Sequence, residues 1–181
     1  MKWTDRLVRA RVPLSWAVGL AALLLAEPTP LTYGVGLCLA AGGEVWRTWA
    51  AGHLRKGEGL TRSGPYAWTR NPLYLGSVLV GMGFALATAR WEVVALLLLL
   101  FVAVYLPVIR TEAGHLAEKY PVDYAVYADR VPLLLPCPPR NADSHPASDE
   151  PFSWRRVWLN KEHLTWLGCV AVAVFLGLLM N

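Results

Sequence analysis

Residues 72–109 read PLYLGSVLVGMGFALATARWEVVALLLLLFVAVYLPVI, two apolar stretches with only Arg90, Trp91 and Glu92 between them. Each stretch has the roughly 17 residues that suffice to cross the hydrocarbon core of a bilayer as a helix. Because three residues allow only a short turn, the two helices have to run antiparallel. The sequence therefore predicts a membrane-embedded helical hairpin.

Three further apolar segments lie outside the hairpin, at residues 12–26, 31–52 and 164–180. The chain has 181 residues, of which 55% are hydrophobic and only 17% are charged. This composition argues against an ordinary water-soluble globule, and the apolar segments leave no room for a separate soluble catalytic domain. We expect an all-α fold, a polytopic membrane bundle of about five transmembrane helices, with loops and short helices capping its cytoplasmic face.

The basic residues predict the orientation of this bundle. With a cytoplasmic N-terminus, 16 of the 17 Lys and Arg residues lie on the cytoplasmic side, and Arg90 alone lies outside. Lys and Arg near helix ends are retained on the cytoplasmic side. A cleavable signal peptide is the alternative for residues 12–26, but no small-x-small cleavage pattern follows that segment. We expect a multi-pass protein of a bacterial inner membrane, with its active site facing the cytoplasm.

The predicted organisation has three parts. Residues 1–136 form the membrane-embedded core with four transmembrane helices and the cap. Residues 137–153 are rich in Pro, Ser and Asp and are expected to form a flexible linker. Residues 154–181 are expected to form an interfacial helix, in which tryptophans alternate with basic residues on anionic lipid, and the last transmembrane helix.

The cap is expected to contain a short helix opened by Pro121. Before it, residues 110–119 can continue the second hairpin helix. An apolar and aromatic stripe recurs every three or four residues and indicates a packed face; its members are Leu116, Tyr120, Tyr124, Tyr127 and Val131.

The densest group of polar and aromatic residues directly precedes the hairpin. Pro72 suits the first turn of a helix and Asn71 suits its N-cap, so residues 71–76 form the cytoplasmic mouth of a transmembrane helix. Free backbone N–H groups and the positive end of the helix dipole favour an anionic ligand group there, and Arg70 adds a full charge. A capped helix start with a snorkelling arginine is the simpler alternative.

Other polar residues near the apolar segments allow two interpretations each. Glu112 pairs either with a cationic ligand or with a neighbouring arginine. Glu44 lies three residues before Arg47, which indicates a structural ion pair or the polar wall of a ligand cavity. Gly81 and Gly83 indicate close helix packing.

Several functional classes are disfavoured by the sequence. The three cysteines and four histidines have no metal-ligand spacing, so we expect no metal site. A Ser/His/Asp grouping and a phosphate-binding loop are both missing from the sequence. The basic residues flank apolar segments instead of forming one stripe, which favours membrane lipids over nucleic acid as a partner.

Two blocks of the sequence resemble the isoprenylcysteine carboxyl methyltransferase family and its phospholipid methyltransferase relatives. The first block is GEGLTRSGPYAWTRNPLYLGS at residues 57–77, and the second is EAGHLAEKYPVDYAVYADRVPLLLP at residues 112–136. In the family the first block usually contains Arg-His-Pro-x-Tyr, where this chain has Asn71 in place of His. The second block usually begins with two glutamates, where Ala113 follows Glu112. The resemblance covers about residues 31–136 and excludes the linker and the last helix.

The resemblance implies an integral membrane enzyme that uses S-adenosylmethionine as its methyl donor at the cytoplasmic face. It implies that Arg70 and Arg130 are catalytic, orienting the acceptor or the carboxylate of the cofactor. It further implies a cofactor-binding set that consists of Asn71, Pro72, Leu73, Tyr74, Gly76, Glu112 and Tyr124. The implied acceptor is a lipid-like or prenylated small molecule, with carboxyl O-methylation favoured over methylation of a phospholipid amine.

The residues are consistent with such chemistry. Methyl transfer needs a nucleophile held in line about 3 Å from the methyl group, and it benefits from the exclusion of water. We expect four aromatic residues to roof the site, namely Tyr66, Trp68, Tyr124 and Tyr127. An amine acceptor also has to lose a proton, for which Glu112 or a substrate phosphate is the candidate base.

The sequence leaves two other functions open. Sterol reductases have a similar Arg-x-Pro-x-Tyr block and a similar Arg-Val-Pro ending, which leaves an NADPH-dependent membrane reductase. A non-catalytic membrane partner protein is the second alternative, because the usual His and the second Glu are missing.

Overall fold

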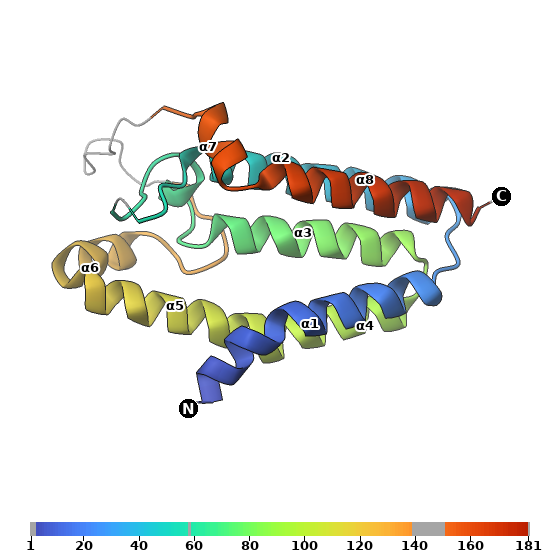
Figure 1. Cartoon of the computed structure of the whole chain (residues 1–181), viewed down its shortest axis with the longest axis horizontal. Helices are drawn as coiled ribbons and strands as arrows, with labels where there is room; N and C mark the ends of the chain where they lie inside the picture. Colours follow the sequence, from blue (N-terminus) through green and yellow to red (C-terminus); the bar gives the residue numbers. More distant parts are fainter. Residues whose placement is uncertain (1–2, 58, 139–150, 181) are drawn as a thin grey trace.

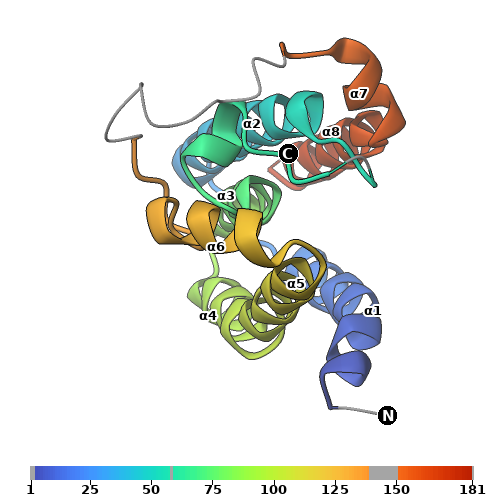
Figure 2. The same cartoon turned by 90° about the vertical axis from the view of Figure 1, so that its left-hand side faces the viewer.

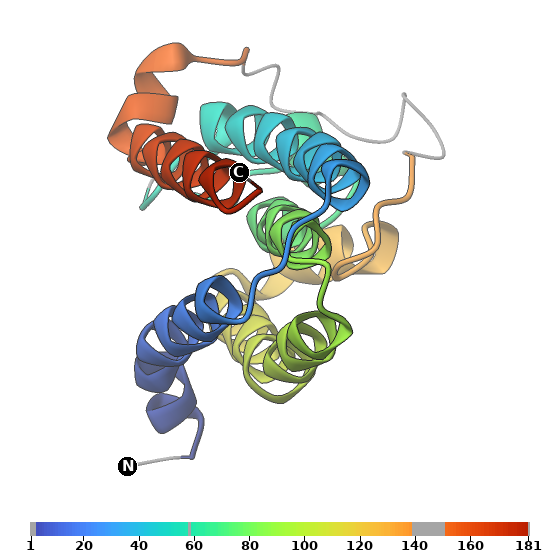
Figure 3. The same ribbon diagram turned by 90° about the vertical axis from the view of Figure 1, so that its right-hand side faces the viewer.

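The computed structural model describes residues 3–57, 59–138 and 151–180, with side chains from residue 9 onward. The described residues form helices and connecting loops and contain no strand, so the predicted all-α class is confirmed. The long helices run nearly parallel to one another (Figure 1). Viewed from the end where the N-terminal helix turns into the next one, they form two groups (Figure 3).

We call the first group the tight half. It consists of α2 (Pro30–His53), α3 (Pro72–Ala87) and α8 (Glu162–Leu178). Proline occupies the first turn of both α2 and α3, where its missing N–H removes no helical hydrogen bond. The predicted opening of a helix at Pro72 is confirmed.

Backbone contact joins α2 to α3. A Cβ atom on Gly43 would lie 2.7 Å from the backbone nitrogen of Val80, and one on Gly83 would lie 2.5 Å from that of Ala40. No side chain fits between the helices at these positions, so only glycine permits this approach. The packing role predicted for Gly83 is confirmed, whereas Gly81 faces Leu97 of the neighbouring helix.

A buried ion pair attaches α8 to the other two helices of the tight half. The Nε atom of Arg47 lies 2.6 Å from Oε1 of Glu162 and 3.9 Å from Oε2 of Glu44. Its Nη1 atom donates to the carbonyl of Leu73, 3.4 Å away, and to Ser77. The structural ion pair predicted for Glu44 and Arg47 is therefore present, and it extends to the first turns of α3.

The short helix α7 (Trp154–Leu159) closes the C-terminal end of α2. Arg156 Nε donates to the carbonyl of Gly52 at 2.7 Å, and Asn160 Nδ2 donates to that of Ala51 at 2.8 Å. These bonds satisfy carbonyls that have no partner within α2. His53, at the same helix end, is buried against Ser63, and burial together with the charge of Arg156 lowers its pKa.

We call the second group the open half. It contains α1 (Trp3–Leu24), α4 (Trp91–Leu100), the π-helical turn η2 (Phe101–Tyr105) and α5 (Leu106–Lys119). The last three form one continuous helix of 29 residues, so the predicted continuation through residues 110–119 is confirmed. The turn directly precedes Pro107, whose ring removes a helical donor and favours a local irregularity.

The continuous helix at residues 91–119 is the one helix within the described ranges that is long and apolar enough to cross a membrane by length and composition. Two other apolar helices, α3 and α8, are shorter, with 16 and 17 residues. Five spans and a cytoplasmic N-terminus stay predictions. The predicted hairpin is present as α3 and α4, but the residues between the helices are 88–90 and not 90–92, because Trp91 and Glu92 belong to the first turn of α4.

The cap consists mainly of the 3-10 turn η1 (Gly64–Ala67) and of α6 (Pro121–Arg130), which follows α5 at the end of the bundle (Figure 2). Tyr124, Tyr127 and Val131 are buried there, and Leu116 and Tyr120 pack against them. The predicted stripe is confirmed. The predicted linker lies mostly at residues 139–150, outside the described residues.

Candidate functional site

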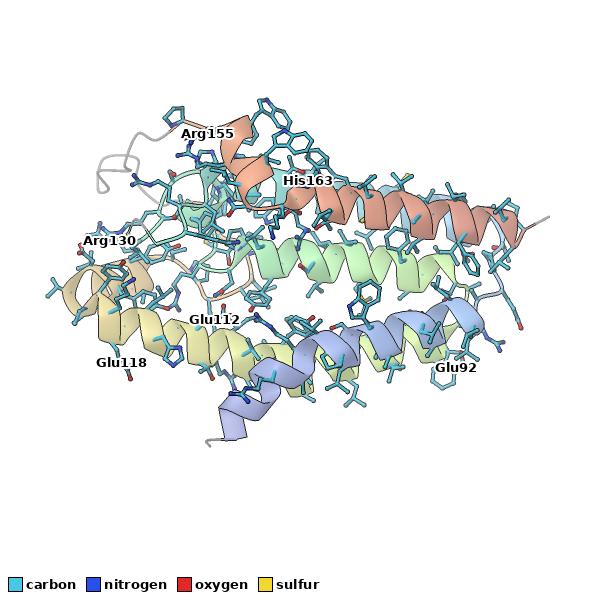
Figure 4. All side chains as sticks on the ribbon, viewed as in Figure 1. Glu92, Glu112, Glu118, Arg130, Arg155 and His163 are labelled. Carbon is cyan, nitrogen blue, oxygen red and sulfur yellow. The ribbon has the colours of Figure 1, made fainter. Side chains whose placement is uncertain are left out.

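The two sequence blocks meet at the start of α3. The hydroxyl of Tyr74 donates to Oε1 of Glu112 at 2.9 Å, across 38 residues of sequence. Beside this contact, the backbone nitrogen of Arg70 donates to the carbonyl of Pro132 at 2.9 Å. Figure 4 shows Glu112 on α5 in the space toward α3, with Glu118 on the opposite side of the helix. The expected proximity of Tyr74 and Glu112 is confirmed.

The helix α1 completes this contact with a side chain that was not predicted from the sequence to belong to the site. Arg11 Nη1 lies 2.7 Å from the hydroxyl of Tyr74 and 3.2 Å from Oε1 of Glu112. One turn later, the hydroxyl of Ser15 lies 2.7 Å from that of Tyr105. We call these five residues, from four different elements, the polar cluster. Arg11 and Ser15 share a face of α1 through their i, i+4 spacing, but the predicted apolar segment began at residue 12 whereas α1 begins at Trp3, so the prediction left Arg11 outside the helix.

Arg70 lies on the other side of the first turn of α3. Its Nη1 atom donates to the hydroxyl of Tyr124 at 3.0 Å, and its guanidinium carbon lies 5.6 Å from the centre of that ring. Its Nε atom is buried and has no hydrogen-bond partner among the described residues. A buried donor without a partner is costly and suits a ligand that accepts a hydrogen bond.

Arg70 contributes to a cavity of about 230 Å³, which we call the basic cavity. Three further basic side chains line it, together with aromatic rings from the cap; these residues are Arg55, Lys56, Lys119, Tyr66, Tyr120 and Tyr127. A cavity with this lining is suited to an anionic group next to a flat ring.

A second cavity, of about 430 Å³, separates α1 from α3 and α8, and we call it the apolar cavity. Its lining follows α3 from Tyr74 to Thr88, a length of about 21 Å at 1.5 Å per residue. Half of the lining residues are leucine, valine or phenylalanine. The polar cluster contributes Ser15, Tyr74 and Tyr105 at one end, so this cavity combines a long apolar channel with a polar end.

The first turn of α3 lies between the two cavities. Arg70 lines the basic cavity and Tyr74, four residues later, lines the apolar cavity. A ligand with a charged part and a ligand with an apolar chain can therefore approach the same helix start from two sides.

The remaining residues of the predicted site have other contacts. Asn71 occupies the N-cap position, but its side chain caps nothing and instead donates to the carbonyl of Leu133 at 2.9 Å. The segment after α6 competes for this amide, which explains the departure from the expected cap. The carbonyl of Pro72 accepts a hydrogen bond from Trp46 at 3.1 Å. At Gly76 a Cβ atom would lie 2.4 Å from Cγ of Arg47, so this glycine packs against α2.

Arg130 lies outside both cavities. It is exposed at the end of α6. Figure 4 shows it beside the cap, away from Glu112. Tyr124, in contrast, is buried and contacts the cavity indirectly through Arg70.

The aromatic residues expected to roof the site divide into two sets. Tyr66 and Tyr127 line the basic cavity, and the hydroxyl of Tyr127 donates to the carbonyl of Tyr66 at 2.7 Å. Burial raises the pKa of both phenols, so they act as neutral groups at physiological pH. Trp68 packs instead against Trp46 and Trp49, at ring-centre distances of 6.3 and 6.4 Å.

Metal ligands are not grouped in the part of the chain that the structure describes. There, no group of three or more His, Cys, Asp or Glu side chains is placed to hold a metal ion.

Comparisons with known proteins find a family and two similar proteins. A family model described as phospholipid methyltransferase matches residues 33–123, half of the chain. The cobalt-zinc-cadmium resistance protein CzcN of Cupriavidus metallidurans is 40% identical over 113 residues, which are 61% of this chain and 50% of that protein. The nickel-cobalt-cadmium resistance protein NccN of Alcaligenes xylosoxydans is 34% identical over 109 residues, 59% of this chain and 49% of that protein.

The chain spans about half the length of these curated relatives. No solved structure matches it. The matched region runs from α2 into α6 and contains Arg70, Tyr74 and Glu112, and the chain therefore belongs to the phospholipid methyltransferase family.

Proposed function

We propose that the protein is a membrane methyltransferase that uses S-adenosylmethionine and methylates a lipid-like acceptor. The observation that carries the proposal is the position of the first turn of α3 between a basic cavity and a long apolar cavity. Membership of the family supports the reaction class. The two cavities support the separation of a charged, water-soluble donor from an acceptor with an apolar chain.

The basic cavity fits the cofactor. S-adenosylmethionine supplies a methyl group activated by a positively charged sulfur, and it carries a carboxylate, an ammonium group and an adenine ring. The unpartnered Nε of Arg70 and the ammonium of Lys119 are suited to the carboxylate. Tyr66, Tyr120 and Tyr127 are suited to the flat ring. Because about 230 Å³ is below the about 300–1,000 Å³ typical of ligand pockets, this cavity encloses part of the cofactor.

The apolar cavity fits the acceptor. An extended hydrocarbon chain advances by about 1.3 Å per carbon, given single bonds of about 1.5 Å. The channel of about 21 Å along α3 therefore takes a chain of about 16 carbons. With the chain in this channel, the head of the acceptor lies against the polar cluster and next to the first turn of α3.

The residues of the chain have three tasks in this reaction. Arg70 holds the carboxylate of the donor, the wall of the apolar cavity excludes water, and Tyr74 with Glu112 orients the acceptor head. Orientation and water exclusion together account for several kcal/mol of a methyl-transfer barrier, on the order of 5. We favour a carboxylate acceptor, because Glu112 already has Arg11 and Tyr74 as partners and is not available to an ammonium group.

Cofactor binding tests the proposal directly. We expect the purified protein to bind S-adenosylhomocysteine in calorimetry and to transfer radiolabelled methyl groups to a component of a lipid extract. Arg70→Gln removes a charged donor, so it should weaken binding by about 10-fold or more. Arg62→Gln is the matched control, because Arg62 pairs with Asp123 in the cap and does not line either cavity.

Two results would contradict the proposal. The first is a lack of S-adenosylhomocysteine binding at millimolar concentration. The second is binding of NADPH in competition with S-adenosylhomocysteine, which would favour a membrane reductase. Equal binding by Arg70→Gln and Arg62→Gln would remove Arg70 from the cofactor site while leaving the reaction class intact.

The names of the two relatives support a second proposal about physiological role. Both are named resistance proteins for divalent metals, and cobalt and cadmium occur in both names. We propose that methyl transfer by this protein contributes to growth in the presence of these metals. Deletion of its gene should reduce growth in cadmium or cobalt, and the intact gene should restore growth while a Glu112→Gln, Tyr74→Phe copy should not.

A further inference from the structure

The polar cluster contains one feature that the proposed cofactor site does not use, the guanidinium of Arg11. This residue lies on α1, outside the region that the family model matches. Its Nη1 atom contacts both the Tyr74 hydroxyl, at 2.7 Å, and the Glu112 carboxylate, at 3.2 Å. One donor group thus joins the two halves of the bundle at the polar end of the apolar cavity.

The charges at this end nearly cancel. Glu112 contributes one negative charge, Arg11 contributes one positive charge, and the hydroxyls of Tyr74, Ser15 and Tyr105 are neutral hydrogen-bonding groups. Tyr74 directs its proton to Glu112 and accepts from Arg11. Glu112 does not itself line the cavity, but it lies one hydrogen bond behind the Tyr74 hydroxyl that does, and without Arg11 its carboxylate would have no compensating charge there.

An anionic ligand is sensitive to this balance. A carboxylate bound next to Tyr74 is repelled by an unpaired Glu112 behind it, because the apolar wall on the cavity side screens charges less than water does. A cationic head group would be attracted by the same unpaired charge. Half-burial of both side chains reduces the effect but does not abolish it, since Arg11 is 31% and Glu112 is 43% exposed.

We propose that Arg11 determines the acceptor specificity of the site by neutralising Glu112 and fixing it to Tyr74. The inference rests on the proposed function, because it assigns the apolar cavity to the acceptor. Arg11 acts through Glu112 and is a positioning residue, and α1 is a part of the acceptor site. The chemical class selected is a single long-chain carboxylate over a long-chain amine.

Binding of two matched probes tests this assignment without relying on turnover. Palmitate and hexadecylamine have the same chain of 16 carbons and opposite head charges. Equilibrium binding of each radiolabelled probe is measured with protein in nanodiscs. We expect the unaltered protein to prefer palmitate, and Arg11→Gln to weaken palmitate binding by about 10-fold while strengthening that of hexadecylamine.

The decisive variant is the double substitution Arg11→Gln with Glu112→Gln. It removes the unpaired negative charge, so palmitate binding should return to within about threefold of the unaltered protein, a non-additive result. A merely structural role for Arg11 would give additive losses. Arg9→Gln is the control on the same helix, because Arg9 is exposed and does not line either cavity.

The outcomes separate this inference from the proposed function. Since no α1 residue lines the basic cavity, S-adenosylhomocysteine should bind equally to the unaltered protein and to Arg11→Gln. A preference of the unaltered protein for hexadecylamine, unchanged palmitate binding in Arg11→Gln, or a double variant no better than the single one would overturn the role of Arg11. Failure of the unaltered protein to bind S-adenosylhomocysteine would overturn the proposed function instead.

Discussion

The tight half and the open half differ in what lies between their helices. In the tight half, α2 and α3 touch through their backbones, with glycine at each point of closest approach. The open half, in contrast, faces the tight half across a cavity of about 430 Å³ that lies between α1 on one side and α3 and α8 on the other, and polar side chains at one end of this cavity connect the two halves. The tight half therefore holds its helices in direct contact, whereas the open half packs against it with space left between the helices.

This difference explains the position of the candidate site. The first turn of α3 is held by α2, by the Arg47 ion pair and by the segment after α6. Glu112 and Arg11 approach it from the open half. A rigid start of α3 keeps Arg70 and Tyr74 in place, while the loosely packed side can accept a hydrocarbon chain.

The largest expected effect comes from breaking the tight half. Gly43→Val places a branched side chain where a Cβ atom already lies 2.7 Å from Val80 N and 2.9 Å from Gly76 O. We expect a loss of about 3 kcal/mol or more in the free energy of unfolding, measured by denaturation in detergent. Gly42→Val is the matched control, since nothing lies within 4 Å of its Cβ position, and it should change stability by less than about 0.5 kcal/mol. Equal effects would show that the backbone contact is not what holds this half together.

An intermediate effect is expected from filling the open half. Gly19 lines the apolar cavity, and nothing lies within 4 Å of its Cβ position. Gly19→Leu should therefore leave stability nearly unchanged but weaken palmitate binding by about 10-fold, because it occupies the space of the chain. Gly168→Leu on α8 is the control, since its Cβ position is equally open and it lies outside the cavity. Undiminished palmitate binding by Gly19→Leu would argue against the chain lying in this cavity.

The smallest expected effect concerns the pH dependence of stability at His53, the last residue of α2. Burial and the charge of Arg156 lower the pKa of His53 below its ordinary value of 6.5. Between the lowered pKa of His53 in the folded protein and its ordinary pKa in the unfolded chain, the unfolded chain binds more protons than the folded one. Stability therefore falls as the pH decreases through this window. The slope from one group is at most about 1.4 kcal/mol per pH unit. Unfolding measured from pH 7.5 to 5 should show this slope, and His53→Gln should flatten it; an unchanged slope would assign it to other groups.

The starts of α3 and α6 could be predicted, because Pro72 and Pro121 act on their own turns. The buried stripe of Tyr124, Tyr127 and Val131 could also be predicted, from its spacing of three or four residues. The pairing of Glu44 with Arg47 followed from their separation of three residues. These predictions share a cause: the interactions are local, and the period of a helix converts sequence spacing directly into spatial position.

Other contacts could not be predicted, because they depend on how distant helices pack. Asn71 has the correct side chain for a cap, yet the carbonyl of Leu133 lies close enough to take its amide. Arg130 matches a motif, yet the end of α6 leaves it exposed. Trp68 was expected over the site, yet two tryptophans of α2 hold it elsewhere.

By itself, the sequence determined the helices, their apolar character, the close packing at Gly83 and the two blocks that carry the family motif. Only the tertiary structure decided that Arg11 joins Tyr74 and Glu112, and that a basic and an apolar cavity lie on either side of Arg70 and Tyr74. The physical reason is the range of the interactions. Helix formation and capping act over about four residues, whereas cavities arise where side chains from helices far apart in the chain fail to fill the space between them.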